Sequence, residues 1–530
     1  MKINYKFFLI FLLLVGILLR FYNLNWGAPF YFHPDERNIA SSVAQLNFPN
    51  QMHPHFFAYG SFPIYLIYFT GFFVNLFSKS QDLFIQAIFI SRFYSAILSS
   101  LTIFLVYFIG TKLLSKQVGI LAAVFSAFSV GLIQFAHFGT FEIWLTFFAV
   151  LLFYLSLKLM EKMNLKKIIL IGIILGLLLA TKISSLPLIL IPAISMAFIN
   201  FKTKYIALIL TTYCIALIVF IITSPFVFLD FPSFQFSIKY ESSVAIGTLP
   251  VFYTGEFFGS VPILFQFTKI YPFLLNPLMT ILFILSLVYL VFLNFKNKSH
   301  SYFLLITSYL LLFTSQSFLF AKWTRYIVPT LPFIYLIIAI AIESFLKKHV
   351  SSIKYYLLCV IVFINFIFAA SYLITVFAKQ DTRIKASLWV KENIPPNANA
   401  ISEVYDMGIV PFNSYLLNIH LFNFYDLDNG LKAEELDSLV SKSDYIILPS
   451  NRILKTRLMN HKKFPNANKF YTALFNNQSG FKKIYQTPCD MFCKITYLGN
   501  PVFGFEQTTN VFDRPTVFIF KKSNLKNEKI

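Results

Sequence analysis

Residues 205–227 read YIALILTTYCIALIVFIITSPFV and carry no charged side chain. A helix needs about 20 apolar residues to cross the hydrocarbon core of a bilayer, so this stretch predicts a membrane-spanning helix. Residues 355–377, YYLLCVIVFINFIFAASYLITVF, repeat the pattern. These two runs decide the class of fold, and the rest of the chain extends it.

The composition of the whole chain agrees with this class. Of its 530 residues, 57% are apolar, 13% are charged and 67 are Phe, and the mean hydropathy is +0.68. Soluble domains average about 45–50% apolar and about 25% charged residues. The sequence therefore predicts a polytopic α-helical membrane protein with about 11–13 spans. Eleven apolar segments carry this prediction: 7–24, 88–110, 118–136, 142–158, 168–180, 185–199, 205–227, 273–293, 302–320, 327–345 and 355–377.

Basic residues near the ends of the spans indicate the orientation, because short cytoplasmic loops carry an excess of Lys and Arg. Alternate loops form two sets, of which one holds 15 such residues and the short turns of the other hold three. We therefore expect a multi-pass protein of the cell membrane with its N-terminus in the cytoplasm. Residues 25–87, 228–272 and the C-terminal region then lie outside.

Some apolar segments do not fit a simple series of spans. Segments 168–180 and 185–199 are short, and they fit either two tilted helices or one broken hairpin. Two further apolar stretches, 61–77 and 255–270, fall in the predicted outer loops. We expect both to form helices that lie in the outer interface, with their aromatic rings at headgroup depth.

The net charge of +21 does not indicate a nucleic acid partner. Residues 1–377 hold 24 Lys and Arg against 9 Asp and Glu, whereas residues 378–530 hold 20 against 14. Most of the excess thus belongs to the membrane part, where basic loops set the orientation. Membrane lipids are the expected partners of this charge, and nucleic acid is not.

The region 378–530 changes in character, because strand and helix patterns alternate there between frequent charges. The segments KASLWVKENIPP (385–396) and LKAEELDSLVS (431–441) predict helices. Strands are predicted for AISEVY (400–405), DYIILPS (444–450) and PTVFIFKK (515–522). We therefore expect a transmembrane domain over 1–377 and a soluble extracytoplasmic α/β domain over 378–530.

Cysteine usage fits this arrangement. Cys489 and Cys493 lie in the C-terminal domain, and an extracytoplasmic compartment would permit a local disulfide between them. Cys214 and Cys359 lie inside apolar runs, where they are expected to pack as small hydrophobic side chains.

Ionisable side chains are scarce in the membrane part, so their positions are informative. The motif YFHPDERN places His33, Asp35 and Glu36 directly after the first predicted span. Adjacent carboxylates near a bilayer need a cation, a metal or a raised pKa, and one of them could accept a proton from an attacking hydroxyl. The competing interpretation is a solvated loop that begins a helix, with Asp35 at the positive end of the helix dipole.

HPDE at 33–36 and HPHFFAYGSFPIYL at 53–66 resemble the bacterial and archaeal members of the protein O-mannosyltransferase family. That family also includes the aminoarabinose transferase of lipid A, within the GT-C class of membrane glycosyltransferases. Similar stretches follow in order along the chain: SRFYSAILS (91–99), AHFGTFEIWLTFF (136–148), ATKISSL (180–186), SPFVFLDF (224–231), KWTRYIVPTLP (322–332), WVKENIPPNANAISEVYD (389–406) and DRPTVFIFKK (513–522). The resemblance covers nearly the whole chain, and the order of the motifs is its strongest element.

This resemblance implies a GT-C-like fold and a glycosyltransferase that uses a polyprenyl-phosphate sugar as donor. The sugar would pass, with inversion at the anomeric carbon, to an extracytoplasmic protein, lipid or glycan acceptor. In such enzymes the acidic residue of the first outer loop is catalytic. Carried over to this chain it is Asp35, with Glu36 beside it, and no nucleotide cofactor is implied.

The departing lipid phosphate requires cations that hold its charge as the bond breaks. Arg92, Lys182 and Arg325 lie at or near the outer ends of predicted spans. We expect these three, with Tyr326 next to Arg325, to bind the donor phosphate, since Arg matches phosphate oxygens bidentately and Lys acts as a point charge. Each cation could instead be an interfacial anchor that snorkels to the headgroups.

A divalent metal ion is left open by the sequence. His33, His55, His137 and Glu142 supply nitrogen and oxygen atoms near the outer face, where they could bind a metal or position the acceptor. Their spacing matches no zinc pattern. Interfacial His residues are more often hydrogen-bonded structural groups.

The departures from the family leave the acceptor open. The aminoarabinose transferases carry a Lys before the Pro of their second outer segment, where this chain has Gly60, Ser61 and Phe62 before Pro63. The main alternative function is a polytopic transporter or lipid flippase, which would place ionisable groups near the bilayer midplane. A third interpretation is an extracellular binding module anchored by many spans.

Overall fold

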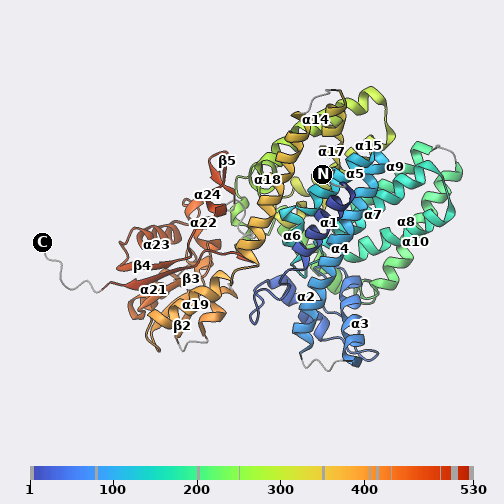
Figure 1. Cartoon of the computed structure of the whole chain (residues 1–530). Coiled ribbons are helices and arrows are strands. Elements are labelled where there is room, and N and C mark those ends of the chain that lie inside the picture. The colour runs from blue at the N-terminus through green and yellow to red at the C-terminus, as the bar shows by residue number, and fades with distance from the viewer. Residues whose placement is uncertain are drawn as a thin grey trace. The chain divides into compact units, whose positions relative to one another are not determined.

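Long apolar helices and a small β-sheet are the main elements of the chain (Figure 1). The computed structural model describes residues 5–77, 82–199, 203–249, 251–348, 353–404, 407–413, 417–430, 432–489, 491–502 and 511–523. They divide into two units. The first comprises Met1–Leu24, Asp35–Ile246 and Val261–Leu373, and the second comprises Asn25–Pro34, Gly247–Ser260 and Ile374–Ile530.

Helices coincide with all eleven apolar segments, because backbone N–H and C=O groups in hydrocarbon must bond within their own segment. The elements are α1 (Tyr5–Phe21), α4 (Leu83–Leu113), α5 (Lys116–Ala127) with α6 (Val130–Ala136), α7 (Glu142–Glu161), α8 (Leu165–Thr181), η1 (Ile183–Ile189) with α9 (Leu190–Ile199), α10 (Thr203–Thr223), α14 (Pro277–Asn297), α15 (His300–Ser317), α16 (Thr324–Ile327) with η4 (Val328–Thr330) and α17 (Leu331–Lys348), and α18 (Ile353–Val376). The predicted helical membrane class is confirmed.

Six helices are long and apolar enough to cross a membrane, and the pair α5 and α6, bent by 56°, is a seventh candidate. The apolar helices Ile10–Phe21, Ser61–Phe77 and Ile183–Ile199 are shorter. These counts concern the described residues and rest on length and composition. The chain is therefore a multi-pass membrane protein, while the total of about 11–13 spans stays a prediction.

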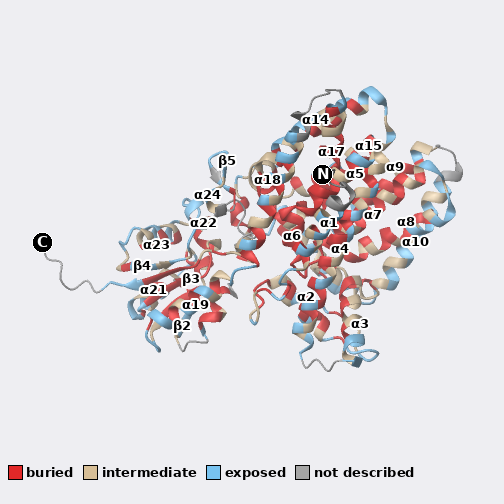
Figure 2. Cartoon of the chain, viewed as in Figure 1, coloured by how far each residue is buried: buried red, intermediate tan, exposed pale blue. Residues whose placement is uncertain are grey.

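The apolar helices differ in what covers them. Only 11% of the apolar window of α10 is buried, against 83% of the window that includes α17 (Figure 2). A helix that is apolar on all sides is stable in the core of a protein or in lipid. The exposed apolar surface of α10 therefore suits a lipid-facing span, whereas α17 lies inside the bundle.

Arg20, at the end of α1, stabilises the break between α5 and α6. Its side chain is fully buried, and its guanidinium donates to the carbonyl oxygens of Ser126 and Ala127, each at 2.8 Å. A third hydrogen bond runs from Nε to Ser99 Oγ at 2.8 Å. The last carbonyl groups of a helix have no intrahelical partner and favour a cation. Arg20 thereby satisfies the end of α5 where no water reaches it.

Shorter elements lie between the long helices: α2 (Pro34–Ala44), α3 (Ser61–Phe77), α11 (Phe226–Leu229), α12 (Phe231–Ile246), η2 (Phe252–Phe257), η3 (Gln266–Ile270) and α13 (Tyr271–Leu274). The predicted helix over 61–77 is present as α3. A single helix over 255–270 is not formed, and that prediction is wrong. Gly259 adopts a positive φ of 70°, and Pro262 lacks a backbone N–H, so the helix cannot continue across this segment.

The second unit contains a five-stranded sheet in the order β2-β1-β3-β7-β4. Strands β1 and β2 and strands β1 and β3 pair in parallel, whereas β7 pairs antiparallel with β3 and β4. The elements are α19 (Thr382–Asn393), β1 (Asn399–Glu403), η5 (Met407–Ile409), α20 (Val410–Asn413), β2 (Asn418–Phe422), η6 (Phe424–Asp426), α21 (Lys432–Lys442), β3 (Tyr445–Leu448), α22 (Arg452–Met459), α23 (Pro465–Phe475), β4 (Phe481–Gln486), α24 (Met491–Lys494), β5 (Thr496–Tyr497), β6 (Asn500–Pro501) and β7 (Phe518–Lys522). The predicted α/β character is confirmed, and β2 and β4 are strands that the sequence did not reveal.

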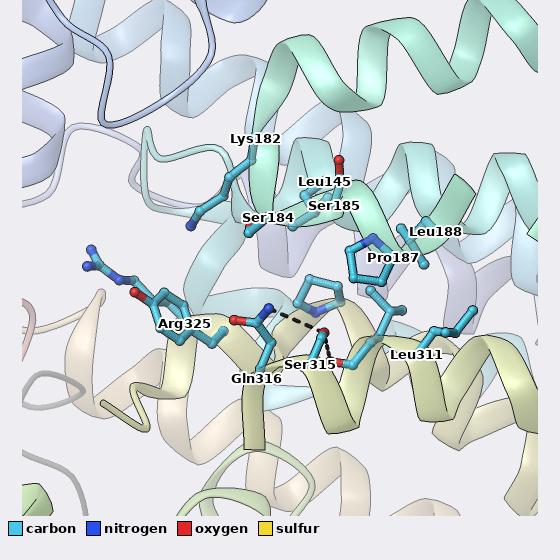
Figure 3. Close-up of a pocket in the computed structure, with 13 residues that line it drawn as sticks. Leu145, Lys182, Ser184, Ser185, Pro187, Leu188, Leu311, Ser315, Gln316 and Arg325 are labelled. Atoms are coloured by element: carbon cyan, nitrogen blue, oxygen red, sulfur yellow. Dashed lines mark hydrogen bonds between the residues drawn. The ribbon is translucent and has the colours of Figure 1, made fainter. Parts of the chain in front are cut away.

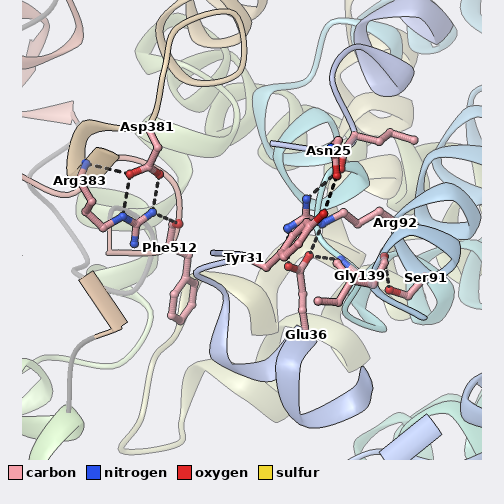
Figure 4. Close-up of polar contacts among 11 residues, drawn as sticks. Asn25, Tyr31, Glu36, Ser91, Arg92, Gly139, Asp381, Arg383 and Phe512 are labelled. Carbon is pink, nitrogen blue, oxygen red and sulfur yellow. Dashed lines mark hydrogen bonds and ion pairs between the residues drawn. The ribbon is translucent and has the colours of Figure 1, made fainter. Parts of the chain in front are cut away.

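Two outer-loop segments belong to this second unit. Arg383 is buried and makes two hydrogen bonds to the Asp381 carboxylate, at 2.8 and 2.6 Å (Figure 4). Its guanidinium also lies over the ring of Phe32, 3.8 Å from the ring centroid. Lys463 lies over the ring of Phe258, with its Nζ 3.6 Å from the ring centroid. Cys489 and Cys493 form a disulfide, with their Cα atoms 5.9 Å apart.

Candidate active site

Asp35 and Glu36 occupy the first turn of α2, which begins at Pro34. Proline suits the first helical position, and carboxylates are favoured near the positive end of the helix dipole. Successive residues of a helix point in different directions. The two carboxylates accordingly have different surroundings: the side chain of Asp35 is 23% exposed, and that of Glu36 is fully buried.

Asp35 lies in a polar cluster with Arg325 and Tyr59. The Arg325 guanidinium forms an ion pair with Asp35 Oδ2, and the Tyr59 hydroxyl donates to the same oxygen at 3.1 Å. Burial, more than the nearby Asp35, raises the pKa of the Tyr59 hydroxyl well above its usual value. Tyr59 is therefore a proton donor to Asp35 across the physiological range of pH.

Lys182 joins this cluster through its contacts with two tyrosine rings. Its ammonium lies 5.1 Å from the ring centroid of Tyr59 and 5.3 Å from that of Tyr326. Its Nζ also donates to Glu142 Oε1 at 3.0 Å. Arg325 lies over the Tyr326 ring as well, at 5.7 Å. Aromatic faces attract cations, so the two tyrosines hold both cations on one site.

Local backbone structure explains why Lys182 and Arg325 point there. Lys182 is extended, with φ −160°, between the end of α8 and η1, so the two short apolar segments are separate helices. Arg325 lies on the single-turn helix α16, which η4 with Pro329 separates from α17. Both cations therefore extend from helix breaks and not from helix faces.

A cavity of about 400 Å³ opens beside this cluster. Its lining includes Tyr59, Lys182 and Tyr326 together with Glu241 of α12 and many apolar side chains. A narrower pocket shares Lys182 and Tyr326 with it and adds Arg325, and the ends of Lys182 and Arg325 extend to the same side of that pocket (Figure 3). Small-molecule sites commonly combine an apolar lining with a few converging polar groups.

Glu36 and Arg92 form a separate buried pair. Arg92 donates from Nε and Nη2 to the two carboxylate oxygens of Glu36, at 2.9 and 2.6 Å, and from Nη1 to the Leu24 carbonyl at 2.8 Å (Figure 4). The backbone N–H of Gly139 donates to Glu36 Oε1 at 2.6 Å. Both side chains have no exposed surface. Arg92 thus cannot reach a donor phosphate as the sequence suggested, and the pair stabilises the packing of α2 against α4.

The histidines are not gathered at Asp35. Both ring nitrogens of His137 lie 2.8 Å from backbone carbonyl oxygens, those of Ile133 and Tyr22, which leaves no nitrogen for a ligand. His55 is exposed and stacks on His53, with ring centroids 3.9 Å apart. The ring of His33 lies 4.1 Å from that of Phe512 in the second unit. The geometry therefore supports structural roles for these predicted ligands.

The fit of a divalent metal can be tested on the donor atoms. Within the described residues, no three His, Cys, Asp or Glu side chains come together as a metal site. Arg325 occupies the position of a cation beside Asp35, and Lys182 does so beside Glu142. The side chains in the described part of the chain do not form a metal centre, and we derive no step through one.

Sequence reasoning missed Tyr59, Glu241 and Gln316 as site residues, all three of which line the cavity. Tyr59 stands directly before Gly60 in the motif HPHFFAYGSFPIYL, which resembles the family. This resemblance could have indicated Tyr59 as a site residue. Glu241 is one of few carboxylates in the outer loops, yet only the fold places it at the cavity. Burial raises the pKa of Glu241, while Arg325 lowers it.

A family model described as dolichyl-phosphate-mannose-protein mannosyltransferase matches residues 62–228. No curated protein matches the chain. The apo oligosaccharyltransferase of Archaeoglobus fulgidus is similar in structure, with a TM-score of 0.57 and 14% identity over 98% of this chain and 89% of that chain.

Two further structures of that archaeal enzyme show the same likeness. Its complex with an inhibitory peptide and a dolichol-phosphate has a TM-score of 0.52 and 12% identity, over 97% of this chain and 88% of that one. Its complex with Zn and sulfate has a TM-score of 0.52 and 14% identity over the same shares, 97% and 88%. At such identities the likeness shows the fold.

The chain thus shares the fold of the archaeal oligosaccharyltransferase. This fold and the family match over residues 62–228 together support a membrane glycosyltransferase, in agreement with the GT-C resemblance in the sequence.

Proposed function

We propose that this enzyme transfers a sugar from a polyprenyl-phosphate donor to an extracytoplasmic acceptor, with inversion at the anomeric carbon and with Asp35 as the base. The observation that carries the proposal is the cluster of one carboxylate and two cations around Tyr59 and Tyr326. The matching family is named for a dolichyl-phosphate-mannose donor. The similar archaeal enzyme was solved with a dolichol-phosphate.

The reaction would be a single displacement. The oxygen of an acceptor hydroxyl attacks the anomeric carbon while its proton passes to Asp35. The bond between that carbon and the phosphate oxygen breaks, and the electron pair leaves with the polyprenyl phosphate. Lys182 and Arg325 neutralise the charge that develops on the phosphate. One displacement at one carbon inverts its configuration.

The ion pair with Arg325 gives the reaction an order. A carboxylate that is paired with a guanidinium is a weak base, because the pairing favours its ionised form. A donor phosphate is a competing bidentate partner for Arg325. Binding of the donor would therefore draw Arg325 from Asp35 and raise the basicity of Asp35 only once a sugar is in place.

Labelled polyprenyl-phosphate sugars supplied to membranes that contain the chain provide the test. We expect transfer by the natural chain and a loss of about 10²- to 10⁴-fold in Asp35→Asn, which removes the general base. Asp82→Asn is the matched control, because Asp82 only caps α4 and Asn caps a helix equally well. Parallel reactions with a chelator test whether transfer requires a divalent metal ion, which the sequence left open.

Two outcomes would contradict the proposal. If the natural chain transferred sugar from none of the polyprenyl-phosphate donors, the proposed reaction would be excluded. Full activity of Asp35→Asn would remove Asp35 as the base while the reaction class remained.

A further inference from the structure

The lining of the cavity carries a second set of polar groups besides the tyrosines and Lys182. Glu241 and Ser242 of α12, Ser315 and Gln316 of α15, and Ser184 of η1 all line it. Of these side chains, four are uncharged hydroxyls or an amide, and the fifth is a carboxyl. This composition differs from that of the cation cluster around Tyr59.

Gln316 is held in position within this lining. Its Nε2 donates to Ser315 Oγ at 3.3 Å, and Ser315 Oγ donates to the carbonyl oxygen of Leu312 at 3.3 Å. Figure 3 shows Gln316 directed from α15 toward the segment that carries Lys182 and Ser184. The amide therefore faces the space into which the cations also extend.

The charges at the cavity favour a neutral ligand beside these groups. Glu241 lines the cavity, and burial raises its pKa toward the uncharged form. Hydroxyls, an amide and a carboxyl can each donate or accept a hydrogen bond, so together they match a ligand with several hydroxyl groups.

On the basis of the proposed function, we propose that Glu241 and Gln316 are specificity-determining residues that read the hydroxyl groups of the transferred sugar. The cations at Lys182 and Arg325 then hold the phosphate, and the apolar part of the cavity accommodates the first part of the prenyl chain. A site built to bond a hydroxyl strongly rejects an analogue that lacks it, because its own polar groups are left unpaired. The donor sugar is accordingly an uncharged hexose or pentose.

The experiment compares a short-chain polyprenyl-phosphate hexose with its monodeoxy analogues, using purified full-length protein. We expect kcat/KM of the natural chain to fall about tenfold or more for at least one deoxy donor. In Glu241→Gln and in Gln316→Met, the ratio of kcat/KM between the natural donor and a deoxy donor should fall. Each variant should show this fall for the one hydroxyl that its side chain contacts. The affinity for sugar-free polyprenyl phosphate should stay within about twofold, because the phosphate contacts are unchanged.

Glu161→Gln is the matched control, since Glu161 is 60% exposed and pairs with Lys112 outside the cavity. A cooperative unfolding transition shows that each variant is folded. If Gln316→Met fails to fold, the isosteric variant Glu241→Gln still tests the inference. The inference would be overturned if the variants discriminated between the natural and deoxy donors as the natural chain does. It would also be overturned if they lost affinity for the sugar-free carrier as much as they lost kcat/KM for the donor. Either result would leave the proposed function intact. A preference for an amino sugar or a uronate would overturn the assignment to a neutral sugar. Absence of transfer by the natural chain from every donor would overturn both.

Discussion

At the residue scale, neighbours in the sequence have different surroundings. Asp35 is partly exposed beside Arg325 and Tyr59, whereas Glu36 is fully buried with Arg92. A buried ion pair needs both members, because either one alone is an uncompensated charge in a low dielectric. Only Asp35 is therefore placed to meet a substrate, and Glu36 has the surroundings of a structural residue.

Glu36→Gln tests this division. We expect the free energy of unfolding to fall by about 3–5 kcal/mol, because Arg92 stays buried without its counter-charge. Unfolding in detergent would measure it, with Glu161→Gln as the exposed control. The double variant Glu36→Leu with Arg92→Met should regain much of the stability. A stable Glu36→Gln that has lost transfer would instead place Glu36 in the chemistry.

Glu241 predicts a dependence of stability on pH. Burial raises its folded-state pKa above 4.5, the usual value. The unfolded chain therefore binds the proton less tightly, and the stability that this group contributes at low pH is lost as the pH rises through the raised value. Glu241→Gln, which does not titrate, should equal the natural chain below pH 4.5 and exceed it in stability at neutral pH. Unfolding temperatures measured across this range would show it, and a gain confined to low pH would contradict the argument.

At the element scale, one close approach positions the second outer segment on α8. The N–H of Gly60 donates to the carbonyl of Thr181 at 3.0 Å, and a Cβ at Gly60 would lie 1.9 Å from the carbonyl oxygen of Ala180. Only glycine permits this contact between backbones. It brings Tyr59 to the helix end from which Lys182 extends.

Gly60→Ala should therefore disturb the site more than the fold. We expect overpacking to cost about 1–3 kcal/mol and transfer to fall about 10²-fold, since a shift of about 1 Å can have that effect. Activity and unfolding temperature are both measured. Gly255→Ala is the control, because its Cβ would meet no atom closer than 3.5 Å. Normal transfer by Gly60→Ala would show that this contact does not position Tyr59.

At the scale of the whole molecule, the proposal depends on orientation, which the distribution of basic residues predicts. Lys166 lies in the loop set rich in Lys, and Asn393 lies in the predicted extracytoplasmic domain. Both side chains are exposed. In a background with Cys214→Ser and Cys359→Ser, an impermeant thiol reagent on intact cells should label Asn393→Cys and not Lys166→Cys. The reverse pattern would place the site in the cytoplasm.

The sequence by itself determined the membrane class, the eleven long apolar helical segments and the α/β character of the C-terminal part, because these follow from local composition and periodicity. It also pointed to Asp35, Lys182 and Arg325, since ionisable groups near lipid are few. Tertiary structure decided what those groups touch. Strands β2 and β4, the buried pairing of Arg92 with Glu36, and the approach of Glu241 to the cavity all depend on contacts between distant segments. No local pattern encodes such contacts, because they arise only when helices pack.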